Sequence, residues 1–268
     1  MLRRFALTPG LVVLALQAAV GFRTASAQEF IVPVNGATNA IFGGAYVAFS
    51  LPEGTTTYVV YASGAAYYAP GRLFAGLIMD RKTGSYTELI AVAIPSGVPV
   101  EITDSGPDQR AELFFVDDDR ADNSGSFQVT ITPNAGAPLT FEVSASQHCI
   151  DVSRAASIDL PIAVCDMQAS GSAWWAGPGH LYKTVVGMYD DDSVPPKRTF
   201  SHLEVNGSRR PLLNFLGGPI RLFFADLQGE MFDNGGDVLV TFRCDPQVPV
   251  RASTWGVMKH LWTGDTTP

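Results

Sequence analysis

The feature that most constrains how this chain can fold is an acidic segment that occurs twice. The first copy, residues 113–131, begins with an apolar run, continues through an aspartate-rich loop that ends in Asp-Asn-Ser-Gly, and returns to alternating apolar and polar residues. The second copy, residues 222–240, has the same order and ends its loop in Asp-Asn-Gly-Gly. Such an order is typical of a strand, a polar loop and a second strand. One β-structured unit is therefore expected to occur twice.

A second pair of matching segments supports the duplication. Ala-Ser-Gly, two aromatic residues and Pro-Gly follow one another from position 62 and again from position 169, and their Gly and Pro residues predict loops. Gly64 precedes Asp117 by 53 positions, and Gly171 precedes Asp226 by 55 positions. Two matched motifs at a matched separation predict a tandem duplication.

Short strands separated by Gly, Pro, Ser or Asp are predicted along the chain, and no helical apolar stripe is evident. The clearest predicted strands are residues 45–50, 57–61, 73–79, 86–94, 98–102 and 112–116. The sequence therefore predicts an all-β fold of two tandem antiparallel β-sandwich domains, jelly-roll-like or galactose-binding-like. The expected division is a signal peptide at residues 1–27, domains at 28–134 and 135–246, and a C-terminal tail at 247–268, either a short helix or an extended strap.

The N-terminus predicts export. Arg3 and Arg4 precede an apolar run at residues 11–20, and Ala25-Ser26-Ala27 supplies the small residues at which signal peptidase cleaves. A membrane anchor, the alternative, needs about 20 uninterrupted apolar residues. We therefore expect a periplasmic or secreted protein with no membrane span in the mature chain.

The charge of the mature chain limits its partners. Residues 1–27 contain three of the 18 basic residues and none of the 26 acidic ones, so the mature chain has 15 basic and 26 acidic residues and a formal charge of −11. This balance disfavours nucleic acid, whose phosphates attract clusters of Lys and Arg. Carboxylates concentrated in loops suit a hard cation such as calcium, although a solvated acidic surface is an alternative.

All three cysteines lie in the second half of the chain, and an exported protein can retain a disulfide. Cys149 and Cys165 lie symmetrically about residues 156–157, where a strand-turn-strand would bring them opposite each other. We therefore predict a Cys149–Cys165 disulfide with Cys244 free, although three cysteines allow three pairings.

The two acidic loops carry candidate calcium ligands, because calcium takes six to eight oxygens from carboxylates, amides and backbone carbonyls. Gly125 and Gly235 permit the backbone curvature that such a loop needs. The alternative is plain turn chemistry, in which these side chains bond to their own backbone. The candidate ligands are Asp117, Asp122 and Asn123 in the first copy, and Asp226, Asp233 and Asn234 in the second.

The acidic loop with its following strand, together with the segment from Ala62 to Pro70, resembles the galactophilic bacterial lectins of the LecA (PA-IL) type. The resemblance implies a calcium ion that bridges protein and sugar hydroxyls, with further ligands from the backbone carbonyls of Tyr68 and Trp175. It also implies a carbonyl near Arg120 or Ala121 and one near Glu230 or Met231. Residues 70–79 are too few to hold the family's galactose-contacting loop, so galactose specificity does not follow.

Aromatic pairs at Tyr67 and Tyr68 and at Trp174 and Trp175 are candidate carbohydrate-binding platforms, because sugar rings have apolar faces. In an alternating strand, however, one member of each pair should face the core.

The sequence contains no Gly-x-Ser-x-Gly, His-Glu-x-x-His, phosphate-loop or Cys-x-x-Cys motif, so we expect no enzyme. The leading hypothesis is an exported calcium-dependent carbohydrate-binding protein with one site per domain, which would raise avidity for a glycan surface. One alternative is a structural or adhesive sandwich whose acidic loops are only turns or hold calcium for stability. The other is a secreted hydrolase or an accessory subunit of one.

Overall fold

The computed structural model of the chain describes residues 27–246, apart from residues 36, 42–45, 51, 53–54, 83–85, 94–98, 104–109, 162, 192–193, 213–214, 216 and 228–232. The predicted C-terminal tail and all but the last residue of the predicted signal peptide lie outside the described residues, as do Glu230 and Met231.

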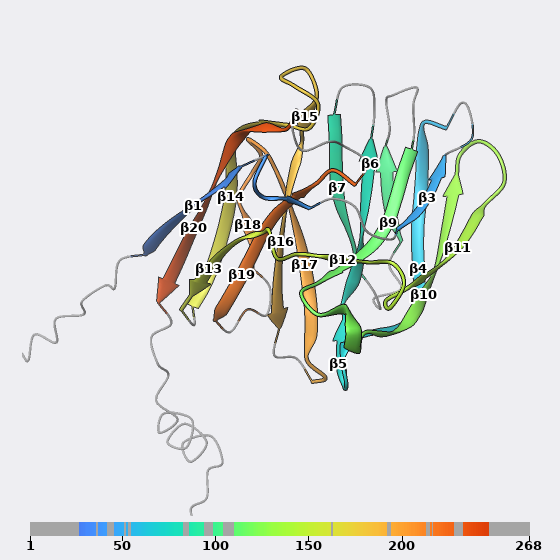
Figure 1. Ribbon diagram of the computed structural model, residues 1–268, viewed down its shortest axis with the longest axis horizontal. Coiled ribbons are helices and arrows are strands. Elements are labelled where there is room, and N and C mark those ends of the chain that lie inside the picture. Colours follow the sequence, from blue (N-terminus) through green and yellow to red (C-terminus); the bar gives the residue numbers. More distant parts are fainter. Residues whose placement is uncertain are drawn as a thin grey trace, which may run out of the picture.

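The described residues form twenty strands and one short 3-10 turn, η1 (Arg120–Asp122), and contain no α-helix, which confirms the predicted all-β class (Figure 1). The strands of the first half are β1 (Gln28–Asn35), β2 (Ala40–Ile41), β3 (Val47–Ser50), β4 (Thr57–Ala69), β5 (Arg72–Phe74), β6 (Gly76–Lys82), β7 (Tyr86–Ala93), β8 (Val100–Thr103), β9 (Arg110–Asp117) and β10 (Ser124–Pro133). Those of the second half are β11 (Leu139–Ser144), β12 (Cys149–Asp151), β13 (Ala156–Leu160), β14 (Ala163–Trp174), β15 (Leu181–Tyr182), β16 (Thr184–Asp191), β17 (Lys197–Glu204), β18 (Arg210–Pro211), β19 (Gly218–Ala225) and β20 (Gly235–Pro246).

The Ala-Ser-Gly segments, predicted as loops, belong to long strands instead. Gly64 lies in β4 at φ +119°, and a Cβ on it would lie 2.6 Å from the carbonyl oxygen of Ser126 in β10. Gly171 lies in β14 at φ +128°, where a Cβ would lie 2.4 Å from the carbonyl oxygen of Asp237 in β20. The prediction was wrong because these glycines permit a close approach of two strands instead of a turn.

The strands form two ten-stranded sheets that extend through both halves of the chain. One sheet has the order β1-β20-β14-β15-β7-β6-β9-β12, with β18 on β14 and β3 on β9; the other has the order β11-β10-β4-β5-β17-β16-β19-β13, with β8 on β4 and β2 on β19. In the middle of each sheet the two halves meet through a parallel pair, β15 with β7 and β5 with β17.

The pairing pattern of the first ten strands is repeated by the second ten. Each strand of one sheet has a counterpart ten places away in the strand numbering, and the counterparts are neighbours in the other sheet. For example, β20-β14-β15-β7 in one sheet corresponds to β10-β4-β5-β17 in the other, so the two sheets are related by an approximate twofold symmetry. The registers match as well: Phe115 pairs with Cys149, and Phe224, 109 positions after Phe115, pairs with Ala40, 109 positions before Cys149.

The first two strands of each half pair with the other half. β1 and β2 pair with β20 and β19, and β11 and β12 pair with β10 and β9. Figure 1 shows the exchange, since blue β1 lies beside red β20. The predicted boundary between residues 134 and 135 falls between β10 and β11, so it does not separate the strands by pairing. A sequence pattern identifies a strand and its buried face, but it does not identify the distant strand with which it pairs.

Buried apolar side chains fill the space between the two sheets in two groups. One group combines β4 and β10 of one sheet with β6 and β9 of the other, and it includes Tyr58, Phe114 and Phe127. The second group combines β14 and β20 with β16 and β19, and it includes Phe224 and Phe242. Because burying each such aromatic ring stabilises the fold by roughly 1.5–3 kcal/mol, these groups hold the sheets together.

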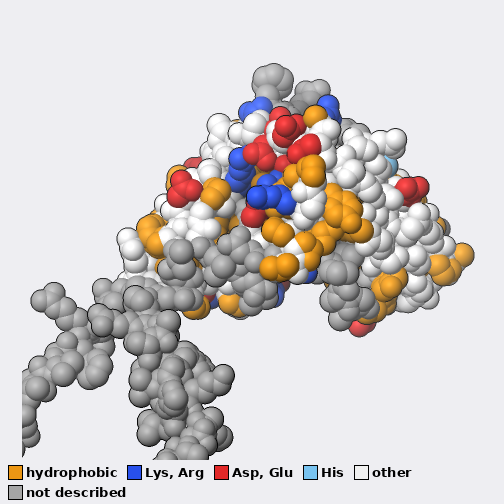
Figure 2. All heavy atoms as spheres, turned by 90° about the horizontal axis from the view of Figure 1, so that it is seen from below, with side chains coloured by type: hydrophobic (Ala, Val, Ile, Leu, Met, Phe, Trp, Pro, Cys, Tyr) orange, Lys and Arg blue, Asp and Glu red, His pale blue; other side chains and the backbone are white. Residues whose placement is uncertain are grey.

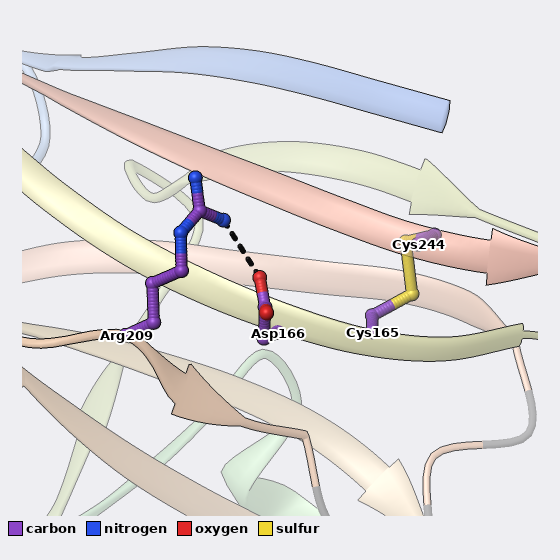
Figure 3. The surroundings of a disulfide bond; sticks show 4 residues. All are labelled: Cys165, Asp166, Arg209 and Cys244. Atoms are coloured by element: carbon purple, nitrogen blue, oxygen red, sulfur yellow. Dashed lines mark hydrogen bonds and ion pairs between the residues drawn. A yellow bond between two sulfur atoms is a disulfide. The ribbon is translucent and has the colours of Figure 1, made fainter. Parts of the chain in front are cut away.

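The disulfide differs from the predicted one. Cys165 in β14 lies directly opposite Cys244 in β20 and is bonded to it, with 4.1 Å between the Cα atoms (Figure 3). Cys149 is free and buried in β12. The predicted Cys149–Cys165 bridge was wrong because the strands on either side of residues 156–157 do not form a hairpin: β12 pairs with β9, and β13 pairs with β19.

Within the described part of the chain, no helix has the length and apolar character required to cross a membrane.

Candidate metal and carbohydrate site

The first acidic loop connects the end of β9 to β10 at the edge of the core. Asp117 is the last residue of β9 and is only 4% exposed. The side chain of Asp119 accepts a hydrogen bond from the backbone N–H of Ala121 (3.1 Å) and so caps η1. Asn123 follows η1 and is again buried, at 6% exposure. The loop thus uses Asp119 for turn chemistry and returns the chain so that Asp117 and Asn123 meet in the interior.

Three oxygen acceptors converge where the loop returns. The side-chain nitrogen of Asn123 donates to the carbonyl oxygen of Ala145 (3.4 Å), so its amide oxygen faces the carbonyl oxygen of Tyr68 and Oδ2 of Asp117. That end of the amide lies 3.1 Å from the Tyr68 oxygen and 2.8 Å from the Asp117 oxygen. We call these three groups the first oxygen cluster. Such a meeting requires either a rotated amide that donates to both acceptors or a cation among the three.

The second half repeats this arrangement. The amide oxygen of Asn234 faces the carbonyl oxygen of Trp175, with which it is in close contact, and Oδ2 of Asp226 at 3.3 Å. These three groups form the second oxygen cluster. Asp226 is fully buried and Asn234 is 8% exposed. The same three kinds of acceptor, a carboxylate, an amide and a backbone carbonyl, therefore meet in both halves.

Each aspartate uses its other oxygen for a basic side chain from the opposite half. Oδ1 of Asp117 accepts from the guanidinium of Arg198 in β17, and Oδ1 of Asp226 accepts from Nζ of Lys82 in β6 at 2.9 Å. Arg198 lies over the ring of Tyr68, 4.1 Å from its centre, and Lys82 lies over the ring of Trp175 at 5.2 Å. Each cluster is therefore built from both halves of the chain.

Burial governs the protonation of these groups. Burial raises the pKa of Asp117 to about 6, although Arg198 acts to lower it. Burial alone would lower the pKa of Lys82, but Asp80 and Asp226 raise it above the ordinary value, so its ammonium stays charged. Burial likewise opposes the charge on Arg198, but Asp190 and Asp117 raise its pKa. Both clusters thus have a permanent positive charge on one side and an acceptor-rich side facing the asparagine.

The structure brings together some of the predicted ligands and separates others. Asp117, Asn123 and the Tyr68 carbonyl meet in the first oxygen cluster, and their counterparts meet in the second. Asp122 and Asp233 are exposed beside their buried asparagine neighbours. The carbonyl oxygen of Arg120 accepts from the backbone N–H of Asn123 at 3.4 Å. Among the described residues there is no group of three or more His, Cys, Asp or Glu side chains that could hold a metal, so each cluster depends on amide and carbonyl oxygens as well.

The four predicted aromatic platforms differ in their surroundings. Tyr68 is 4% exposed and has Arg198 over its ring, which argues against a sugar platform there. Tyr67 is half-buried. Trp174 is half-buried against the backbone of Gly235, where an added Cβ would lie 3.0 Å from the indole. Trp175 is half-buried, and its ring centre lies 5.2 Å from that of His180. Three of the four rings therefore keep some exposure.

Sequence reasoning missed the two basic residues of the site. Arg198 is 81 positions from Asp117, and Lys82 is 144 positions from Asp226. Neither stands in a motif, so only the pairing between halves reveals them.

Two hollows adjoin the first oxygen cluster and share Asp118. The larger, of about 420 Å³, is lined by residues of the acidic loop together with Ile150 and Asp151. The smaller, of about 190 Å³, is lined mainly by β16, β17 and β19 and includes Arg198 and Arg221. Figure 2 shows acidic and basic side chains gathered in one cluster on the lower face of the molecule.

Comparison with known proteins finds no matching family model, no matching curated protein and no matching solved structure. The resemblance to the galactophilic lectins therefore rests on the residues of the two loops.

Proposed function

We propose that this chain is an exported, non-enzymatic protein of two repeated β-sandwich units that binds carbohydrate through calcium, with one candidate site in each repeat. The observation that carries the proposal is the pair of oxygen clusters. In each, a carboxylate oxygen and a backbone carbonyl oxygen face the end of an asparagine amide, and with the amide oxygen turned towards them these three groups are the ligands that calcium prefers. In that orientation a cation among the three acceptors removes their repulsion, whereas without a cation the rotated amide would donate to both.

The residues present fit a calcium ion without supplying its full coordination. Each cluster offers three oxygens, and the exposed Asp122 or Asp233 stands next to the asparagine on the outer side. Calcium takes six to eight oxygens, so water and ligand hydroxyls would complete the shell. A bound ion would supply Lewis-acid contacts to sugar hydroxyls. The chain's own residues hold the loop and keep Arg198 and Lys82 on the opposite side of each aspartate.

A structural or adhesive protein is the second candidate, and the ion pairs between halves favour it. Asp117 with Arg198 and Asp226 with Lys82 join the two repeats at buried positions. Removing one partner of a buried ion pair typically lowers the stability of a protein by about 3–5 kcal/mol, so these pairs explain the two aspartates without a bound metal.

Calcium titration by calorimetry on the chelator-treated mature chain, followed by glycan-array binding with and without chelator, separates the candidates. The proposal expects saturable calcium uptake and glycan binding that the chelator abolishes. Absence of calcium uptake, with folding unaffected by chelator, would leave the structural candidate. Turnover of chromogenic glycosides or esters would contradict the non-enzymatic assignment.

A further inference from the structure

The smaller hollow beside the first oxygen cluster is built from both repeats. Asp118 comes from the first repeat, whereas Met188, Asp190, Arg198 and Arg221 come from β16, β17 and β19 of the second. Nη2 of Arg221 lies 2.7 Å from Oδ2 of Asp118, and Nε of Arg198 lies 2.9 Å from Oδ1 of Asp190. Resting on the proposed function, we propose that this hollow is the subsite that recognises the sugar, and that it takes an uncharged sugar ring.

The charges of the hollow favour a neutral ligand. Two arginines face two aspartates, and each arginine is already bonded to a carboxylate, so an anionic sugar would have to displace one of these partners. Sugar hydroxyls both donate and accept, so they can bond to a carboxylate and a guanidinium at once. Met188, Tyr189, Gly217 and Pro219 complete the lining of the hollow with uncharged residues.

The polar side chains remain reachable from outside. The side chains of Asp118, Asp190 and Arg221 are 44%, 39% and 28% exposed. Arg198, which is 11% exposed, links the hollow to the first oxygen cluster because it also bonds to Asp117. A cation that orders the loop from Asp117 to Asn123 would thereby fix Asp118 at the rim of the hollow. The calcium dependence of sugar binding then has a second source, the ordered loop, beside the contacts of the ion with sugar hydroxyls.

The corresponding place in the other repeat is closed. The counterparts follow from the strand registers. Lys82 of β6 pairs with Thr87 of β7, just as Asp190 of β16 pairs with Arg198 of β17, so Lys82 corresponds to Asp190 and Thr87 to Arg198. In the same way, Asp80 pairs with Glu112 as Met188 pairs with Arg221, so Glu112 corresponds to Arg221. The four equivalents are buried or nearly so: Thr87 and Glu112 are each 1% exposed, Leu227 in place of Asp118 is 4% exposed, and the Lys82 side chain is 13% exposed. The described residues of the other repeat therefore form no equivalent of this hollow.

The test uses the mature chain with calcium and saturation-transfer NMR on methyl glycosides of galactose, glucose, mannose and fucose, with methyl glucuronide as the charged probe. Arg221→Gln removes a charged donor at a partly exposed position. Hydrogen bonds to charged groups contribute about 1.5–3 kcal/mol, so we expect affinity for the neutral glycoside to fall about tenfold or more. Calcium affinity, measured by calorimetry, should stay unchanged.

Two further variants make the result specific. Asp190→Asn keeps the size of the side chain and should also weaken glycoside binding, so the test does not depend on one variant. Arg209→Gln is the matched control, because Arg209 forms a similar surface ion pair with Asp166 (2.7 Å; Figure 3), and neither residue lines the hollow. It should bind the glycoside as the wild type does.

The outcomes separate the subsite from the proposed function. Chelator-sensitive glycan binding that Arg221→Gln and Asp190→Asn leave unchanged overturns the subsite and leaves the function standing. Glycoside binding that both variants weaken but chelator does not affect supports the subsite and contradicts the role of calcium. Tighter binding of glucuronide than of every neutral glycoside overturns the proposed ligand class. No glycan binding by the wild type overturns both proposals.

Discussion

At the scale of the residue, Asp117 and Asp226 each divide their two carboxylate oxygens between two tasks. Oδ1 bonds to a basic side chain of the other repeat, and Oδ2 faces the asparagine amide. The first contact ties the repeats together whether or not a metal is bound. The second is favourable only if a cation is present or the amide is turned. Whether the amide oxygen or the amide nitrogen of Asn123 faces Asp117 thus separates the calcium-dependent lectin from the structural protein.

Asn123→Asp tests this point, because it puts a second charged acceptor against Asp117. With calcium bound, the added carboxylate is a better ligand, so the melting temperature should equal or exceed that of the wild type. In chelator the two carboxylates repel each other without compensation, and we expect a loss of roughly 1–3 kcal/mol. The measurement is thermal unfolding in calcium and in chelator. An equal loss in both conditions would show that Asn123 acts as a hydrogen-bond donor.

Asp80 is the second informative residue. It is fully buried among Lys82, Glu112, Asp226 and Thr87, its Oδ1 accepts from the hydroxyl of Thr87, and burial raises its pKa to about 7. Because the folded-state pKa lies above the unfolded value of 3.8, the folded state holds this proton more tightly. The stability that Asp80 contributes is therefore complete below pH 4 and is lost as the pH rises towards 7.

Asp80→Asn should flatten this pH dependence. We expect the variant to gain stability relative to the wild type at pH 8 and to lose that gain near pH 4, as measured by urea unfolding at a series of pH values. Asp159→Asn, at an exposed position of β13 outside both oxygen clusters, serves as the control and should follow the wild type. If the difference in unfolding free energy between the wild type and Asp80→Asn did not change with pH, the raised pKa of Asp80 would be refuted.

At the scale of the element, the long strand pairs β4 with β10 and β14 with β20 depend on glycine. Alanine at Gly64 or Gly171 would bring a Cβ within 2.6 or 2.4 Å of a carbonyl oxygen on the neighbouring strand, at a positive φ. We expect each substitution to lower the free energy of unfolding by roughly 2–4 kcal/mol, measured by denaturant titration. Gly177→Ala has the positive φ but open space around it, so it should cost only about 1–2 kcal/mol. Equal losses at all three positions would mean that the close strand approach is unimportant.

The disulfide also belongs to this scale, because it joins β14 to β20 and closes a loop between residues 79 positions apart. Replacing both Cys165 and Cys244 by serine should lower the free energy of unfolding by roughly 2–4 kcal/mol, because the unfolded chain regains conformational freedom. Replacing Cys149 by alanine, which leaves the bridge intact, is the comparison. A double variant as stable as the wild type in denaturant would contradict this contribution.

At the scale of the whole molecule, the duplication is visible in the sequence, but the way the repeats combine is not. The repeated Asp-Asn and Ala-Ser-Gly motifs allow the all-β class and two equivalent loops to be predicted. The pairing of β1 with β20 and of β2 with β19 joins strands more than a hundred positions apart, and alternation within one strand does not encode it, whereas their counterpart β11 pairs with the adjacent strand β10.

The same limit explains the missed parts of the site. Asp117, Asn123 and Tyr68 could be named because they stand in local motifs. Arg198 and Lys82 come from strands of the opposite repeat and carry no motif of their own. The Cys165–Cys244 bridge was missed for a related reason, since it requires knowing that β14 and β20 are neighbours. Long-range strand pairing thus determines both the disulfide and the completed site.

The most direct measurement of the central proposal is calorimetric titration of calcium into the chelator-treated protein, residues 28–268, and into its double variant Asn123→Leu, Asn234→Leu. Leucine removes the amide oxygen from both clusters but leaves the ion pairs of Asp117 and Asp226 in place. The account predicts saturable calcium binding by the wild type and none by the double variant. A wild type that takes up no calcium, or a double variant that binds it equally well, would contradict the account.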